Sequence, residues 1–316
     1  KSTALVGVWL FIQLNFNIAY GPYQALIRDL VPVGRIGVAA SFKILMDAAG
    51  AVAMIAVSGA LIGRYTGADN IKWLWLTLGV LGVTVVASTA ITTLTVRSRE
   101  ASSIREVTAA PATRPRFHPQ LRRFLLSRFL MFTAVFVFPT YGLFFLRDLV
   151  GLDNPAQALG NMILPIGGAL ALSVYPAGWL SDKVGRKPVV LAGAVGAAVA
   201  TIAMLWADST LEVLIIATVI GSSVGVLVSA SWALANDLGT AGREAQHMGM
   251  VTVATVSGAG VAKIIGPLVD LLNQASPGWG YSGLLIACAV LFLVGALLLM
   301  PLKTDLRPAV NPQAVP

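Results

Sequence analysis

Long apolar runs separated by short polar connections make up almost the whole chain. A helix needs about 20 mostly apolar residues to cross the hydrocarbon core of a bilayer. By this measure the sequence predicts nine membrane-spanning helices, over residues 3–27, 37–62, 73–96, 122–146, 156–180, 188–207, 211–235, 246–270 and 280–302. The pattern therefore predicts an all-α membrane protein.

The longest polar segment, 97–121, is rich in Ser, Thr, Ala, Pro and Arg and has no apolar periodicity. Such a segment is typical of a linker between two packed bundles. We therefore predict a partial three-helix bundle over 1–96, a cytoplasmic linker over 97–121, a six-helix bundle over 122–302 and a cytoplasmic tail over 303–316.

Composition and charge support a membrane protein and exclude several other classes. Hydrophobic residues make up 57% of the 316 residues and charged residues 11%, whereas a soluble domain averages about 25% charged residues. The single cysteine, Cys288, excludes a disulfide framework. His118 and His247 are far apart in sequence, which argues against a metal site. There is no phosphate-binding G-x-x-x-x-G-K loop and no catalytic triad, so we expect neither an enzyme nor ATP-driven transport, and no cofactor.

The basic residues predict the orientation of the chain. With the loop 178–188 on the cytoplasmic side, fifteen Lys and Arg residues lie on that side and four on the other. Cytoplasmic loops carry such an excess. This topology also explains the net charge of +8 without a nucleic acid partner. We expect a multi-pass protein of the plasma (cytoplasmic or inner) membrane.

The segment GWLSDKVGRKP, residues 178–188, is the strongest motif in the chain. Its charged residues cannot lie in hydrocarbon, so it must form a tight turn between two helices. Gly185 can adopt the positive φ that ends one helix, and Pro188 suits the first turn of the next. The defining positions of the motif are Gly178, Asp182, Lys183, Gly185, Arg186 and Lys187. The spacing G-x-x-x-D-K-x-G-R-K resembles the signature loop of the major facilitator superfamily, which follows the second helix of each six-helix half.

This resemblance implies a gating role for the loop. In the family the carboxylate at the position of Asp182 docks on the N-terminus of helix 11, and here the helix that starts near Arg243 corresponds to helix 11. Arg186 and Lys187 would hold neighbouring cytoplasmic helix ends and reach lipid phosphates. The alternative is a basic loop that only sets topology.

An internal repeat agrees with the resemblance. The segment 25–35, ALIRDLVPVGR, aligns without a gap with 233–243, ALANDLGTAGR, at an offset of 208 and with six identities. Two charged positions are identical in the two segments, pairing Asp29 with Asp237 and Arg35 with Arg243. Internal repeats are expected in transporters. The same offset places the counterpart of Asp182 before Lys1, so we expect helices 4–12 of a twelve-helix fold that is truncated at its N-terminus. A genuine nine-span protein is the alternative.

Charges inside predicted spans are candidates for coupling or substrate contact, because an unpaired charge in the membrane is costly. Lys43 and Asp47 lie four residues apart and share a helix face, with Asp47 near the bilayer midplane. The alternative is a structural ion pair. Lys263 is a second candidate, although it could instead reach the membrane surface. Arg128 lies near a cytoplasmic helix end, and we assign it to the interface.

Uncharged polar residues give a weaker signal. One stripe recurs at three- or four-residue spacing on the first predicted helix: Gln13, Asn17, Tyr20 and Gln24. Tyr141 and Asn161 could join it around a solute. Hydrogen bonding between helices is the alternative for each of them. The pair Gly221 and Gly225 predicts a close helix–helix contact.

The resemblance implies secondary active transport of a small organic solute by alternating access, and we predict coupling to protons. The partners would be the solute, protons and the bilayer, and we expect a monomer. The segment GPYQALIRDLVP, residues 21–32, is similar to members of the sugar-cation symporter type, although Arg28 stands where a proline is expected. Efflux of drugs or other hydrophobic compounds and a non-transporting, family-like assembly factor are the alternatives.

Overall fold

The computed structural model describes most of the membrane-spanning part of the chain. The described residues are 11, 15, 23, 31, 35–62, 71–100, 119–148, 151, 155–207, 209–239, 244–276 and 278–302. They belong to two compact units, one formed by residues 1–43 and 114–316 and the other by residues 44–113. Each unit is described by itself.

The described residues are almost entirely helical, and no strand occurs among them, as the sequence predicts. The helices are α2 (Ile36–Ile62), α3 (Ile71–Glu100), α4 (Pro119–Asp148), α5 (Pro155–Val184), α6 (Arg186–Ala203), the 3-10 helix η3 (Met204–Trp206), α7 (Thr210–Asp237), α8 (Glu244–Ile264), α9 (Gly266–Ala275) and α10 (Trp279–Leu299). Among the described residues, seven helical segments are long and apolar enough to cross a membrane.

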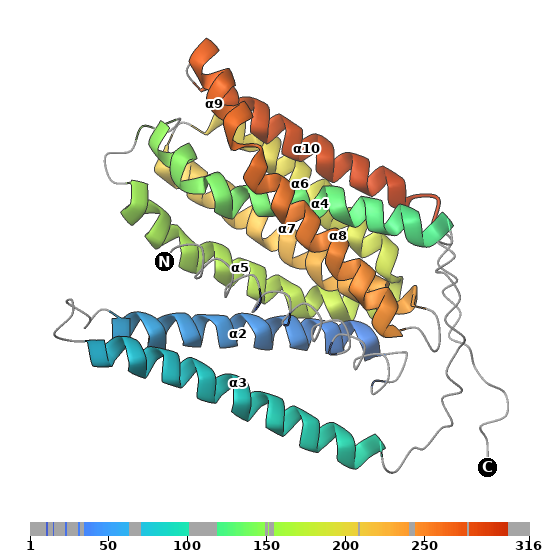
Figure 1. Ribbon diagram of the computed structural model, residues 1–316. Helices are drawn as coiled ribbons and strands as arrows, with labels where there is room; N and C mark the ends of the chain where they lie inside the picture. Colours follow the sequence, from blue (N-terminus) through green and yellow to red (C-terminus); the bar gives the residue numbers. More distant parts are fainter. Residues whose placement is uncertain are drawn as a thin grey trace. The chain divides into compact units, whose positions relative to one another are not determined.

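The larger unit is a bundle in which α4, α5, α6, α7, α8 and α10 lie side by side (Figure 1). Within it, α7 packs against both α5 and α6, while α4 packs between α8 and α10. The helix α9 follows α8 after a break at Ile265, directly before the Gly266-Pro267 pair. A proline at the start of a helix needs no partner for its nitrogen, so the chain can restart there.

Helix ends differ from the predicted spans by a few residues. Helix α3 continues to Glu100 and α4 already begins at Pro119, so both helices extend into the predicted linker. Hydropathy marks the part of a helix that lies in hydrocarbon, whereas the helix itself continues into the headgroup region. The predicted spans after residue 122 each have a helix in the structure, with the span 246–270 divided between α8 and α9. Of the predicted helix over 3–27, the structure describes only residues 11, 15 and 23, and each of them is helical.

Local sequence signals explain two helix boundaries. Ser209 and Glu212 form a capping box at the start of α7: Ser209 Oγ accepts from the Glu212 amide at 3.2 Å, and Glu212 Oε2 accepts from the Ser209 amide at 3.3 Å. Gly185, with φ of 100°, is the single residue between α5 and α6. The predicted positive φ at this turn is confirmed, and a side chain here would be strained.

The predicted close packing at Gly221 and Gly225 is also confirmed. A Cβ atom on Gly221 would lie 2.8 Å from the Ile166 carbonyl oxygen, and one on Gly225 would lie 2.5 Å from the Leu170 carbonyl oxygen. The backbones of α7 and α5 therefore approach each other closely at both glycines.

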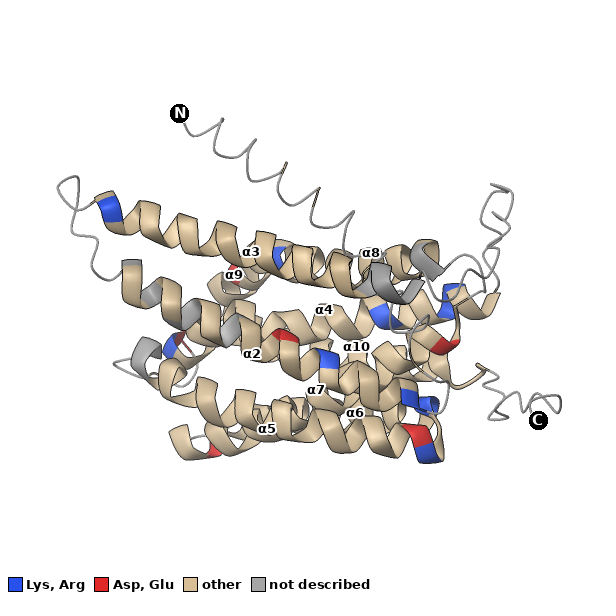
Figure 2. Cartoon of the chain, turned by 90° about the horizontal axis from the view of Figure 1, so that it is seen from below, with Lys and Arg blue, Asp and Glu red and all other residues tan. Residues whose placement is uncertain are grey.

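Two clusters of buried apolar residues form the interior of the bundle. The larger joins α4, α6, α7, α8 and α10, and the smaller joins residues such as Met162, Met204 and Val213 from α5, η3 and α7. Charged residues of the bundle gather mainly toward its ends, with long uncharged stretches between them (Figure 2). This distribution is expected for helices that cross hydrocarbon.

The smaller unit contains the rest of α2 and α3. Most side chains of α3 between residues 71 and 95 are exposed, including Trp75, Val83 and Leu94. Large exposed apolar surfaces are unusual for a soluble protein but ordinary for helices that face lipid.

Candidate functional site

The predicted motif forms the junction between α5 and α6. Asp182 lies in the last turn of α5, and both of its carboxylate oxygens accept backbone hydrogen bonds from the start of α2. The Gly37 amide donates to Oδ1 at 3.0 Å and the Val38 amide to Oδ2 at 3.0 Å. The first amides of a helix have no partner within the helix and carry partial positive charge. Asp182 therefore caps α2 with a full negative charge.

Arg186, in the first turn of α6, connects this cap to the end of α7. Its Nη1 atom donates to Asp182 Oδ1, and its Nε atom donates to Asp237 Oδ2 at 3.1 Å. The side chains of Asp182 and Arg186 are only 10% and 9% exposed. Charge-assisted bonds in such partly buried positions are stronger than surface pairs. We call Asp182, Arg186, Asp237 and the amides of Gly37 and Val38 the Asp182 cluster.

Two glycines allow the helices to come this close. A Cβ atom on Gly178 would lie 1.8 Å from Ser41 Oγ and 2.6 Å from the Gly37 carbonyl oxygen, and one on Gly37 would lie 2.6 Å from the Gly178 carbonyl oxygen. Beside this contact, Ser41 Oγ lies 2.7 Å from Ser229 Oγ of α7, and both serines are fully buried. The glycine at the first position of the motif is therefore required by the contact with α2.

The two lysines of the motif have different surroundings. Lys187 Nζ donates to the carbonyl oxygens of Met300 and Leu302, just beyond the end of α10. A cation is favourable at the C-terminal end of a helix. Lys183 is exposed, and its Nζ lies 3.7 Å from the centroid of the Trp179 ring. Such a cation–aromatic pair is typical of residues at a membrane surface.

The predicted docking partner of Asp182 is wrong. The sequence analysis assigned it to the helix that starts near Arg243, whereas the structure places it at the start of α2. The two helix starts are repeat counterparts: α8 begins at Glu244 and α2 at Ile36, which are separated by the repeat offset of 208. The prediction therefore identified the correct position within the repeat but assigned it to the wrong copy, α8 in place of α2. Arg243 and Asp29 lie outside the described residues, and Arg35 is exposed directly before α2.

The assignment of Arg128 to the membrane interface is also wrong. Arg128 is 1% exposed and lies inside the bundle between α4, α7 and α8. Its Nε donates to Thr255 Oγ1 at 2.8 Å and its Nη1 to Ser231 Oγ at 2.5 Å. The guanidinium carbon lies 4.1 Å from the centroid of the Trp232 ring. Hydrogen bonds and aromatic contact together make a buried guanidinium tolerable.

Lys43 approaches the same tryptophan from α2. Its Nζ lies 5.9 Å from the Trp232 ring centroid and 5.6 Å from that of Tyr23. Trp232 is therefore in contact with two cations, Arg128 from α4 and Lys43 from α2. This grouping was not predicted, because its members come from helices that are distant in sequence.

The other predicted candidates are scattered. Asp47 and Asn161 are exposed, and Lys263 is exposed in the last turn of α8. Tyr141 lies near Gly266, whose added Cβ would be 3.2 Å from the tyrosine Oη. The predicted stripe falls on residues outside the described part of the chain: Gln13, Asn17, Tyr20 and Gln24. Their roles stay predictions.

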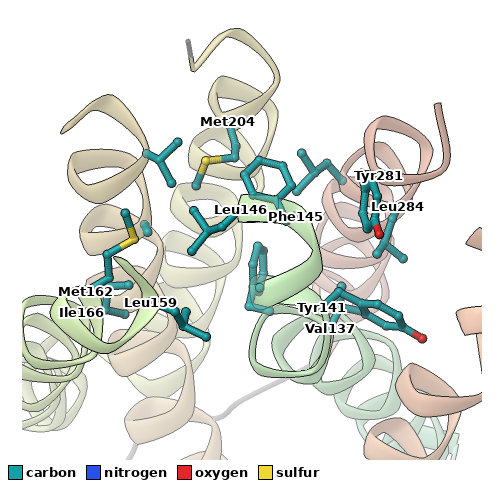
Figure 3. A pocket seen from close by; sticks show the side chains of 15 residues that line it. Val137, Tyr141, Phe145, Leu146, Leu159, Met162, Ile166, Met204, Tyr281 and Leu284 are labelled. Atoms are coloured by element: carbon teal, nitrogen blue, oxygen red, sulfur yellow. The ribbon is translucent and has the colours of Figure 1, made fainter. Parts of the chain in front are cut away.

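A cavity of about 110 Å³ lies in the opposite half of the bundle from the Asp182 cluster. Side chains from α4, α5, η3, α7 and α10 line it, and all of them are apolar except two tyrosines, Tyr141 and Tyr281 (Figure 3). The Tyr281 hydroxyl donates to Asp148 Oδ2 at 2.6 Å, and Asp148 also pairs with Arg147. No motif in the sequence pointed to this cavity.

Comparison with known proteins shows which sequences the second half of the chain resembles. Residues 166–315 match the sequence profile described as Major Facilitator Superfamily. The chain is 30% identical over 159 residues to the multidrug resistance protein MdtM of Salmonella typhimurium, covering 50% of this chain and 37% of that protein. It is 31% identical over 141 residues to the inner membrane transport protein YajR of Escherichia coli, covering 44% of this chain and 29% of that protein.

A solved structure extends the likeness to most of the chain. The proton:xylose symporter XylE, bound to 6-bromo-6-deoxy-D-glucose, superposes with a TM-score of 0.59 over 87% of this chain and 65% of that chain. At 14% identity this likeness shows the fold alone. The chain spans less than two thirds of each of these relatives. It is a multi-pass integral membrane protein, and its residues 166–315 match the major facilitator superfamily.

Proposed function

We propose that the chain acts in secondary active transport of a small organic solute by alternating access, in the plasma or inner membrane and coupled to protons. The match to the major facilitator superfamily supports membrane transport, and the similarity to YajR, an inner membrane transport protein, supports the location. In this mechanism two bundles move about a central site and expose it to each side in turn.

The Asp182 cluster is the observation that carries the proposal. It holds the first turn of α2 against the ends of α5, α6 and α7 through two backbone hydrogen bonds and two ion pairs. By the distribution of basic residues this end of the bundle is cytoplasmic. An opening on the cytoplasmic side must break these bonds, so the cluster stabilises the state that is closed to the cytoplasm. A loop that only set topology would need the basic residues but not the capping carboxylate.

Coupling to protons needs an ionisable group that responds to the solute. Asp47 on α2 is our candidate for the group that takes up the proton. Lys43 is a candidate for binding polar solute atoms, because it lies near the same Trp232 ring as Arg128. Charged groups within membrane helices are commonly functional.

Uptake by proteoliposomes tests the proposal. The complete gene product is reconstituted, and accumulation of labelled sugars and related neutral metabolites is measured with and without a pH gradient. We expect accumulation of at least one solute that requires the gradient and that loses this requirement in Asp47→Asn. Flux with unchanged proton dependence in Asp47→Asn would remove Asp47 from the mechanism. An absence of gradient-driven flux for all solutes would contradict the transport proposal.

Efflux of hydrophobic compounds is the second candidate. The similarity to a multidrug resistance protein supports it. The same vesicles distinguish the two functions: efflux predicts proton-dependent movement of a hydrophobic dye such as ethidium, and sugar transport predicts none.

A further inference from the structure

The cavity in the outer half of the bundle has the properties of a binding site. It is lined by residues of a single bundle, all of them within the larger unit of the chain. It lies where the two clusters of buried residues meet: Val137 and Leu284 belong to one, and Met162 and Met204 to the other. Phe138 and Phe145 pack against both clusters and also line the cavity.

The size and lining of the cavity select an apolar guest. Its volume is about 110 Å³, and an apolar protein cavity of about 150 Å³ stays dry and binds benzene. A single aromatic ring is therefore of the right order of size. Water would find few hydrogen-bond partners among these walls and is disfavoured.

The walls favour an aromatic ring over a saturated chain. Four aromatic residues contribute side chains to the lining: Phe138, Tyr141, Phe145 and Tyr281. In Figure 3 the sulfur atoms of two methionines face the cavity from the side opposite the two tyrosines. Rings prefer offset or edge-to-face neighbours, and thioether sulfur makes favourable contacts with ring edges.

The Tyr281 hydroxyl is one of the few polar groups of the lining. It donates to Asp148 at 2.6 Å, at the end of α4. Asp148 does not line the cavity and is also paired with Arg147, so the carboxylate behind the hydroxyl is neutralised. Binding sites commonly combine apolar walls with a few polar groups that fix orientation.

We propose that this cavity binds a neutral aromatic molecule with one ring and a hydroxyl group, the ring between α4, α5, α7 and α10 and the hydroxyl at the Tyr281–Asp148 hydrogen bond. The site lies inside one bundle. Its occupancy therefore does not depend on the transport proposal, and binding can be measured without flux.

Fluorine NMR of 4-fluorobenzyl alcohol with the purified protein in detergent micelles tests the site. Empty micelles correct for partition of the ligand into detergent. We expect a bound signal that saturates with ligand. In Ala217→Leu, which adds carbon atoms to the cavity wall, affinity should fall about tenfold or more, equivalent to about 1.4 kcal/mol. Ala192→Leu, on an exposed position of α6, is the matched control and should bind normally.

A second variant tests the role of the Tyr281 hydroxyl. It also provides an independent test of the site if Ala217→Leu does not fold. In Tyr281→Phe, affinity for 4-fluorobenzyl alcohol should fall about three- to tenfold, the range expected for one hydrogen bond, while affinity for 4-fluorotoluene stays unchanged. The proposal would be overturned by a signal that does not saturate. It would also be overturned if folded Ala217→Leu or Tyr281→Phe bound the alcohol with the same affinity as the parent protein.

Discussion

Removing the Asp182 carboxylate should release α2 from the end of the bundle. In Asp182→Ala the amides of Gly37 and Val38 lose their acceptor, and Arg186 keeps only Asp237 as a carboxylate partner. Removing one partner of a buried ion pair destabilises the folded arrangement by about 3–5 kcal/mol. Because Asp237 remains, we expect the lower value, about 3 kcal/mol, which corresponds to a change of about 150-fold in the population of the open state.

Cysteine labelling measures this population. Ser229 is fully buried beside Ser41 in the closed arrangement, and Cys288 is fully buried in α10. In a Cys288→Ser background, Ser229→Cys should react slowly with N-ethylmaleimide. Adding Asp182→Ala should increase the labelling rate by up to about 150-fold, because only the open state is labelled.

Two controls make the labelling experiment specific. Asp182→Asn keeps an oxygen that can accept one backbone hydrogen bond, so its rate should be intermediate. Asp148→Ala removes a carboxylate at the opposite end of the bundle and should leave the rate unchanged. If Asp182→Ala elutes as a folded, monodisperse protein and labels at the parent rate, the Asp182 cluster does not hold the closed state and the reasoning fails.

Three further substitutions test individual contacts. Gly178→Ala should disrupt the contact with α2 and raise the same labelling rate, whereas Gly167→Ala on the same helix, with no atom within 4 Å of the added Cβ, should be neutral or slightly stabilising. Gly185→Ala should lower the midpoint of thermal unfolding, because φ is 100° there and a left-handed residue costs about 1–2 kcal/mol. Arg128→Gln should destabilise the bundle by about 2–3 kcal/mol in denaturant titrations, through loss of charged hydrogen bonds in the interior; an unchanged midpoint would show that these bonds contribute little.

Features that depend on neighbours in sequence were predictable. The all-α membrane fold follows from hydropathy, and the turn at Gly185 and the helix contact at Gly221 follow from residue type alone. In each case the signal is local: an apolar run of bilayer length, a glycine where the backbone must be left-handed, or a pair of glycines on one helix face.

Features that join distant helices were not predictable in the same way. Asp182 can bind the start of any helix, because the unpaired amides belong to the backbone and are not marked by a residue type. The repeat identified two equivalent helix starts, and only the structure distinguishes α2 from α8. For Arg128, position along the helix was readable, but the direction of its side chain toward Ser231 and Trp232 was not.

The sequence did not reveal the cavity, although one predicted candidate, Tyr141, lines it. It arises from how side chains of five elements fill, or fail to fill, a shared volume. Packing defects depend on rotamers and helix separation, so a list of apolar residues cannot reveal them.

The close contact between Gly37 and Gly178 bears on how sharply α2 can separate from α5. Dispersion attraction fades within about 1 Å of lost contact, and the side chains at this contact, Ser41, Ser181 and Asp182, are too short to stretch across a widening gap. Departure of α2 should therefore be abrupt, with few half-detached positions. Single-molecule distance records across this joint would then show two discrete levels and no continuous drift between them.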